Sequence, residues 1–184
     1  MVRGVRSADD LDAVRALFLE YRAWLVEHRE VTAFDDGVFE RGLQYFDVEV
    51  RALPGEYAPP AGALFLAFRG ATPVGMVALR RLRPRVGEVK RLYVRPKARG
   101  AGIGRRLTGA ALRRARTIGY RRVVLDTLPK MTAAVAMYRS MGFAPIPPYW
   151  AHPYPAALFF EFRFPRSQGF GSAERPSRRR CPPG

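Results

Sequence analysis

A strand that runs into a glycine- and arginine-rich loop and then into a helix most constrains this chain of 184 residues. Residues Glu88–Val94 have strand character, Arg99–Gly104 reads Arg-Gly-Ala-Gly-Ile-Gly, and periodic apolar residues predict a helix over Gly102–Gly119. Glycines let the backbone approach a ligand closely and adopt positive φ. Free N–H groups and the dipole at the start of a helix favour an anion, and Arg105 and Arg106 add positive charge there. This unit therefore predicts an anion-binding turn.

Two common nucleotide motifs fit the loop poorly. The P-loop needs a Lys-Ser/Thr pair after its last glycine, where this chain has Arg105-Arg106. The dinucleotide fingerprint needs a third glycine where Leu107 stands. A tight strand-to-helix turn that binds nothing is the plain alternative, but three glycines flanked by arginines exceed what a turn requires.

The strand before the loop changes phase. With a period of two residues, Val89 faces one side of the sheet, whereas Leu92 and Val94 face the other. An extra residue between Val89 and Leu92 would produce this pattern. We therefore expect a β-bulge, which releases backbone groups from the ladder and often lies beside active sites.

The hydrophobic pattern predicts an α/β fold with a mixed, mostly antiparallel central sheet and helices on both faces. The remaining expected elements are a helix from Ser7 to about His28, a weaker helix at Val38–Ala52, strands at Ala63–Arg69 and Val74–Arg83, a buried strand at Val123–Leu125, a helix at Thr132–Met141 and a strand at Ala157–Phe164. Residues 1–164 are expected to form one domain. The Pro-, Gly-, Ser- and Arg-rich residues 165–184 are predicted to be a disordered basic tail.

The net charge of +16 raises the question of nucleic-acid binding. Lysine occurs only at Lys90, Lys97 and Lys130, and an arginine surplus of this kind is what a GC-rich genome produces without selection for phosphate binding. We therefore expect no specific nucleic-acid partner, although anionic ligands are favoured. No apolar run reaches the roughly 20 residues that span a membrane, and the charged N-terminus is unlike a signal peptide. With Cys181 as the single cysteine, a reduced, cytoplasmic protein is expected.

Two motifs together resemble the GNAT N-acetyltransferase superfamily. Arg99–Gly104 matches its Arg/Gln-x-x-Gly-x-Gly/Ala signature, and Tyr138–Phe143, reading Tyr-Arg-Ser-Met-Gly-Phe, is similar to its second motif. The resemblance covers about Val2 to Phe164 and implies acetyl-CoA as co-substrate. It also implies a set of coenzyme contacts. These are Leu92, Tyr93 and Val94 for the pantetheine arm, and Arg99, Gly100, Ala101, Gly102, Ile103, Gly104 and Arg105 for the pyrophosphate.

The reaction implied is direct attack of an amine on the thioester, with a backbone N–H near Leu92 polarising the thioester oxygen. An alkyl amine must first lose a proton, at a cost of roughly 4–5 kcal/mol at pH 7. Glu88 is the first candidate base and Glu49 the second; Glu88 could equally be an exposed strand carboxylate paired with an arginine. Tyr138 is the candidate general acid for the departing thiolate, and its alternative is a core tyrosine. Cys181 lies in the tail, so a covalent acetyl-enzyme is not expected.

Acceptor-side residues are less distinctive. Tyr149, Trp150 and His152 lie in an aromatic-rich segment that either walls the acceptor pocket or simply packs as a loop, whereas His28 is expected to be solvated. No cluster with metal-ligand spacing is seen.

We expect an N-acetyltransferase that acts on a primary amine of a small molecule or on an amino terminus, and a homodimer is compatible with the sequence. The alternatives are a non-catalytic acyl-CoA-binding regulatory module and an RNA- or ribosome-associated basic protein.

Overall fold

A computed structural model describes residues 1–28, 36–152 and 156–165 of the chain. The strands form one seven-stranded sheet in the order β1-β2-β3-β4-β5-β7-β6. In chain order the elements are β1 (Val2–Gly4), α1 (Ala8–Glu27), α3 (Asp36–Ala52), a 3₁₀ turn (Gly55–Tyr57), β2 (Ala63–Arg69), β3 (Thr72–Arg83), β4 (Val86–Val94), a 3₁₀ turn (Pro96–Ala98), α4 (Ile103–Ile118), β5 (Arg122–Thr127), α5 (Thr132–Ser140), β6 (Ala144–Ile146) and β7 (Leu158–Arg163).

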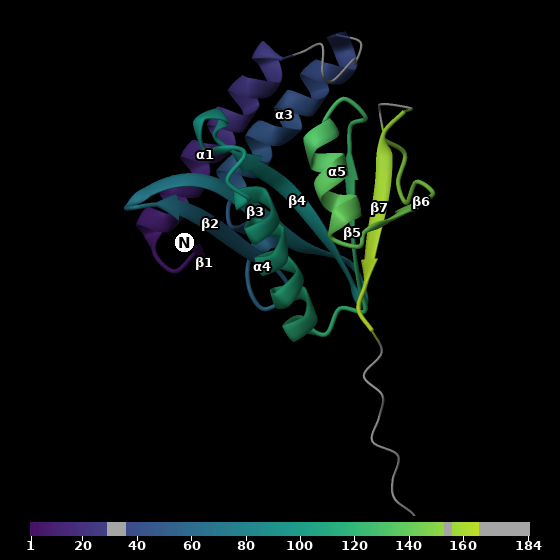
Figure 1. The fold of residues 1–184 in the computed structure, drawn as a ribbon. Helices are drawn as coiled ribbons and strands as arrows, with labels where there is room; N and C mark the ends of the chain where they lie inside the picture. The colour runs from purple at the N-terminus through teal and green to yellow at the C-terminus, as the bar shows by residue number, and fades with distance from the viewer. Residues whose placement is uncertain (29–35, 153–155, 166–184) are drawn as a thin grey trace, which may run out of the picture.

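One strand pair is parallel and all the others are antiparallel. The parallel pair is β4 with β5, which are joined by α4. This mixed, mostly antiparallel sheet confirms the predicted fold class. Figure 1 shows α4 and α5 on the near face of the sheet and α1 and α3 beyond it.

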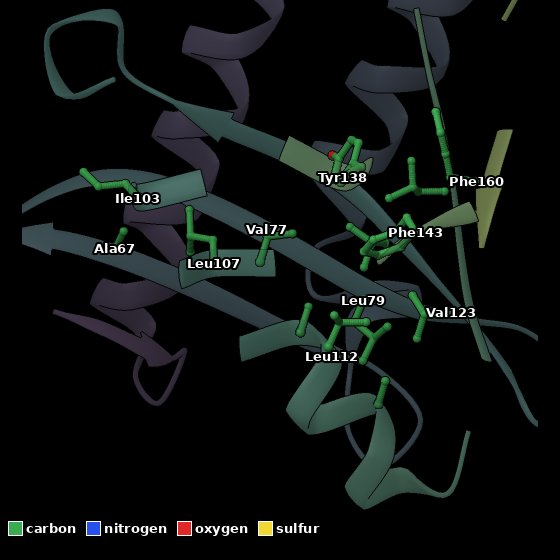
Figure 2. Close-up of a cluster of buried hydrophobic side chains, with 14 of the residues drawn as sticks. Ala67, Val77, Leu79, Ile103, Leu107, Leu112, Val123, Tyr138, Phe143 and Phe160 are labelled. Carbon is green, nitrogen blue, oxygen red and sulfur yellow. The ribbon is translucent and has the colours of Figure 1, made fainter. Parts of the chain in front are cut away.

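Each face of the sheet has its own apolar core. On one face, α4 and α5 pack on β3, β5 and β7 through residues such as Leu107, Val77 and Phe160, as Figure 2 shows. On the other face, α1 and α3 cover β2, β3 and β4 through residues that include Phe18 and Phe46. The helices bury the apolar side chains that the strands present on both faces of the sheet.

The first helix begins as its sequence predicts. The Ser7 side chain accepts a hydrogen bond from the Asp10 backbone N–H at 3.2 Å, as an N-cap should. Asp10 in turn binds the Arg3 guanidinium through two contacts, at 2.5 and 2.7 Å. Because the helix ends at Glu27, His28 is its C-cap.

Some predicted boundaries were wrong. Strands β1 and β6 were not predicted, because three residues are too few to show a period and only their partners β2 and β7 define them. Strand β4 starts at Val86, two residues before the predicted start at Glu88, and β5 extends from Arg122 to Thr127. The predicted tail lies outside the described residues apart from Pro165.

Candidate active site

The central strands β4 and β5 separate partway along the sheet. They pair only at three positions, from Val86 with Arg122 to Glu88 with Val124. Beyond this point β4 stays with β3 as far as Val94, and β5 stays with β7 as far as Thr127. In Figure 1 the two strands meet near the lower end of the sheet and diverge upward. The result is an open ladder edge in the middle of the sheet, which we call the split.

The predicted β-bulge lies on the β4 side of the split. Met76 pairs with Tyr93 and Ala78 with Lys90, so Val77 stands opposite two residues, Arg91 and Leu92. Arg91 has φ +57°, a left-handed conformation that is uncommon for a residue with a side chain. The bulge between Val89 and Leu92 is therefore confirmed.

Glu49 of α3 binds the side chain of Arg91 at this bulge. Its carboxylate accepts hydrogen bonds from Arg91 Nε at 3.0 and 3.1 Å, a third from Arg91 Nη2, and one from the Tyr57 hydroxyl. The Arg91 guanidinium also lies over the Phe46 ring, 4.4 Å from its centroid. Burial acts to lower the pKa of Arg91, but the Glu49 carboxylate outweighs it and holds that pKa above its ordinary value. Glu49 thus fixes the backbone of β4 rather than facing an open site.

After the bulge, the three residues predicted to contact the pantetheine arm point to different faces of the sheet. Leu92 and Val94 are half-buried against the α4 core. Tyr93 points to the other face, where its ring stacks on Tyr21 with 5.3 Å between centroids. The Leu92 and Val94 side chains and the edge of β4 lie beside the start of α4.

The glycine loop presents backbone donors to solvent. Gly100 and Gly102 have φ +80° and +69°, and Gly102 is the N-cap of α4. Within the described chain, the backbone N–H groups of residues 100–105 have no backbone acceptor. Residues 99–102 are exposed, so the donors of residues 100–102 lie at the surface, at the positive end of a helix. This geometry suits an anion, as predicted.

Arginines at the loop are held by neighbours that leave the donors uncovered. Arg99 donates from Nε to the Val94 carbonyl at 3.0 Å and lies over the Trp24 ring at 5.0 Å. Arg105 donates to the Ser140 hydroxyl at 2.5 Å, which ties α4 to α5. Ile103 is buried beneath the loop. Gly104 packs closely against α5, because a Cβ there would lie 3.2 Å from Met137 Sδ and that side chain would have to shift slightly.

Tyr138 belongs to the apolar core but turns its hydroxyl out of it. The ring contacts Phe143 and Phe160 at centroid distances of 5.5 and 6.4 Å. In Figure 2 its oxygen points away from both rings. Among the described residues this hydroxyl has no hydrogen-bond partner. Burial raises the pKa of Tyr138, with Tyr21 and Asp126 adding to the effect, so the hydroxyl keeps its proton at neutral pH.

Glu88 is buried, not exposed. Its side chain is 2% exposed and pairs with Arg80, whose Nε donates to Oε2 at 2.6 Å. The Tyr149 hydroxyl donates to Glu88 Oε1 at 2.8 Å. The expected pairing with an arginine is therefore found, but both carboxylate oxygens are occupied and sealed from water.

Sequence reasoning missed a second carboxylate on the other side of the split. Asp126, near the end of β5, accepts a hydrogen bond from Lys90 Nζ at 3.0 Å. The Tyr149 hydroxyl is 3.3 Å from Asp126 Oδ1, and His152 Nε2 is 3.6 Å from Asp126 Oδ2. Asp126 directly follows the apolar run Val123–Leu125, and only the neighbouring positions of β4 and β5 in the sheet bring it to Lys90. We call Arg80, Glu88, Lys90, Asp126, Tyr149 and His152 the acceptor-face network.

The loop that carries residues 149–152 contacts this network. Tyr149 and His152 both pack edge-on against Phe159 of β7, with centroid distances of 5.2 and 6.1 Å. Lys90 Nζ lies 5.8 Å from the centroid of the Trp150 ring, which is itself 40% exposed. Tyr149 therefore packs as part of the loop, Trp150 borders solvent, and the predicted acceptor-pocket wall stays a prediction.

Other candidates lie apart from the split. The His28 ring is half-exposed and stacks on Trp24 at 4.5 Å. A hollow at the opposite end of α4, which includes Arg85, Arg121 and Arg163 in its lining, contains none of the predicted site residues. Within the described ranges, no group of three or more His, Cys, Asp or Glu side chains could hold a metal ion. No helix there is long and apolar enough to cross a membrane.

Comparisons with known proteins agree with this geometry. The model of the acetyltransferase (GNAT) family matches residues 14–143. An uncharacterised N-acetyltransferase of Schizosaccharomyces pombe is 31% identical over 160 residues, covering 86% of this chain and 91% of the relative. An acetyltransferase structure from Streptococcus agalactiae superposes with a TM-score of 0.69 at 17% identity, over 89% of this chain and 98% of that one. The PaiA N-acetyltransferase of Thermoplasma acidophilum, solved with coenzyme A, gives 0.68 at 16% identity and the same coverage.

An open β4–β5 split beside an exposed glycine loop defines an acyl-transfer fold of the N-acetyltransferase type. The chain belongs to the GNAT family of acetyltransferases, as the family match over residues 14–143 shows. The expected enzyme class, acetyl transfer that depends on acetyl-CoA, is thereby confirmed at the level of the family.

Proposed function

We propose that this protein transfers an acetyl group from acetyl-CoA to a primary amine of a small molecule or to an amino terminus. The observation that carries the proposal is the split, which has backbone donors at one end and a charged network on its acceptor face. The coenzyme pyrophosphate binds the N–H groups of residues 100–105, with Arg99 and Arg105 alongside. The pantetheine arm extends along Leu92–Val94 as an added strand, supported by the free edge of β4.

The acetyl group then lies at the split, within reach of groups on both sides of the split. The amine nitrogen attacks the thioester carbon, the C–N bond forms and the C–S bond breaks. A backbone N–H near Leu92 stabilises the oxygen in the transition state. Tyr138 donates its proton to the departing sulfur; its raised pKa means that the hydroxyl is protonated at neutral pH.

An assay of amine-dependent release of the coenzyme A thiol tests the function directly. We expect acetyl-CoA to yield free thiol with at least one member of a broad panel of primary amines, in step with formation of the acetylated amine by mass spectrometry. Thiol release at an equal rate in every well, without acetylated product, would indicate hydrolysis only. That result would favour a coenzyme-binding module without catalysis.

Replacement of the proposed acid separates catalysis from packing. Tyr138→Phe should lower kcat by about 10²–10⁴-fold with little change in the coenzyme Kd. Tyr120→Phe is the matched control, because Tyr120 is equally buried and donates to the Ala61 carbonyl at 2.5 Å, far from the loop. The control should lose stability of about 1 kcal/mol and keep kcat. Equal kcat in both variants would assign Tyr138 to the core alone.

A further inference from the structure

The acceptor-face network contains several titratable groups, but they differ in access to water. The side chains of Lys90, Asp126 and His152 are 16%, 13% and 11% exposed, against 2% for Glu88. A general base must receive a proton from the acceptor and release it to solvent. Glu88, with both oxygens bound by Arg80 and Tyr149, does neither.

The remaining groups differ in what they can do with a proton. Lys90 is a cation that already donates to Asp126. Burial acts to raise the pKa of Asp126, but Lys90 and His152 outweigh it and hold that pKa well below its usual range. A carboxylate so stabilised is a weak base. Imidazole is the side chain whose ordinary pKa lies nearest neutral pH, which suits it to accept and release a proton.

The placement of His152 also fits this task. Its Nε2 lies 3.6 Å from Asp126 Oδ2, so a carboxylate stabilises the imidazolium that would form. The ring is wedged between Trp150 at 4.6 Å and Phe159 at 6.1 Å, which fixes its plane. Asp126 is itself held by Lys90, and Tyr149 bridges Asp126 to Glu88, so the network behind the imidazole is fully paired.

We propose that His152 is the general base that deprotonates the acceptor amine, with Asp126 as its positioning residue and Glu88 as a buried support. This inference rests on the proposed acetyl transfer. The acceptor ammonium gives its proton to the imidazole, and its lone pair forms the C–N bond. The thiolate takes the Tyr138 proton. The second proton of the nitrogen leaves as the amide forms and restores the Tyr138 hydroxyl, and the imidazolium releases its proton to water. The charged groups that face the imidazole are Asp126 of β5 and, behind it, Lys90 and Glu88 of β4.

The test is the pH profile of kcat/KM in the full-length protein, measured with the amine that the wild type turns over fastest. The wild type should lose activity as the pH falls through the neutral range. His152→Gln should lose about 10²-fold at pH 7 and recover toward the wild type as pH rises, because more amine is then already deprotonated. Asp126→Asn should move the acidic limb to lower pH, since the imidazolium loses its neighbouring anion.

His28→Gln is the matched control, the same substitution at the only other histidine in the chain. It should leave the profile unchanged, and thermal unfolding should show all variants folded. A His152→Gln profile parallel to that of the wild type would overturn the assignment, as would a Glu88→Gln variant that alone abolishes the acidic limb. Absence of turnover by the wild type with every amine would instead refute the transfer function, and the base with it.

Discussion

The two sides of the split recognise their partners by different physical means. On the donor side, residues 100–105 offer backbone N–H groups, and the nearby side chains serve mainly to shape the chain. On the acceptor side, Glu88, Asp126, Lys90 and Arg80 place formal charges in a largely buried network. A site made from backbone is vulnerable to a change of conformation, whereas a site made from paired charges is vulnerable to loss of a partner. The two sides should therefore fail in different ways.

Removal of a charge partner should have the largest effect. Arg80→Met leaves the Glu88 carboxylate buried without its main cation and should lower the free energy of unfolding by about 3 kcal/mol. The double variant Arg80→Met/Glu88→Gln should recover most of that loss, since no unpaired charge remains. Arg81→Met, at an exposed position one residue away, is the control and should change stability little. Urea denaturation measures all four proteins; no recovery in the double variant would mean that packing by Arg80, not its charge, is what counts.

Removal of the Asp126 charge should also lower the free energy of unfolding, and the size of this loss should depend on pH. Asp126→Asn should cost about 1–3 kcal/mol at pH 7, less than Arg80→Met because Lys90 still lies 3.8 Å from Glu88. The folded pKa of Asp126 lies below the ordinary value of 3.8, so its contribution is complete above that pH and is lost as the pH falls further. The difference between variant and wild type should thus not shrink between pH 8 and about 5, and should shrink below about 4. A gap that closes between pH 7 and 5 would contradict a lowered pKa.

A substitution that changes the backbone conformation on the donor side should lower stability slightly and weaken coenzyme binding. Gly100 and Gly70 both have positive φ, and a Cβ added at either would meet no atom within 4 Å. Alanine at each should cost about 1 kcal/mol of stability. Only Gly100→Ala should also weaken coenzyme A binding, by about tenfold, because only Gly100 lies in the loop that we propose binds the pyrophosphate. Calorimetric titration at pH 5 and pH 8 should give the same ratio of Kd values, and equal binding by both variants would remove Gly100 from the site.

The donor side was the part that could be predicted from sequence. Arg99–Gly104 is contiguous, and its glycines and its helix start carry their physical meaning locally. The bulge was also visible, as a change of phase between Val89 and Leu92. By contrast, Lys90 and Asp126 are separated by 36 positions, and Tyr149 reaches Glu88 across 61. Those contacts depend on strand order and loop path, which no local pattern contains.

The same limit explains the errors in detail. Glu88 was predicted as the candidate base or, equally, as an exposed carboxylate paired with an arginine; the arginine is there, but the burial of Glu88 depends on Tyr149 and the loop above it. Strands β1 and β6 are defined by their partners, not by their own three residues. The short run Val123–Leu125 was correctly read as a buried strand because it is apolar on both faces, yet Asp126 beyond it gave no sign of its role.

The split has a consequence for how this chain avoids its neighbours. A sheet that opens between its two central strands exposes two additional edges, and unpaired strand edges are templates for pairing with other chains and for aggregation. The known protective devices are bulges and inward-pointing charges. Both are present here: Arg91 distorts the β4 edge, and Lys90 and Asp126 place charges where a foreign strand would have to enter. Residues at the bulge and in the acceptor-face network should therefore also oppose pairing with a foreign strand when the coenzyme is absent.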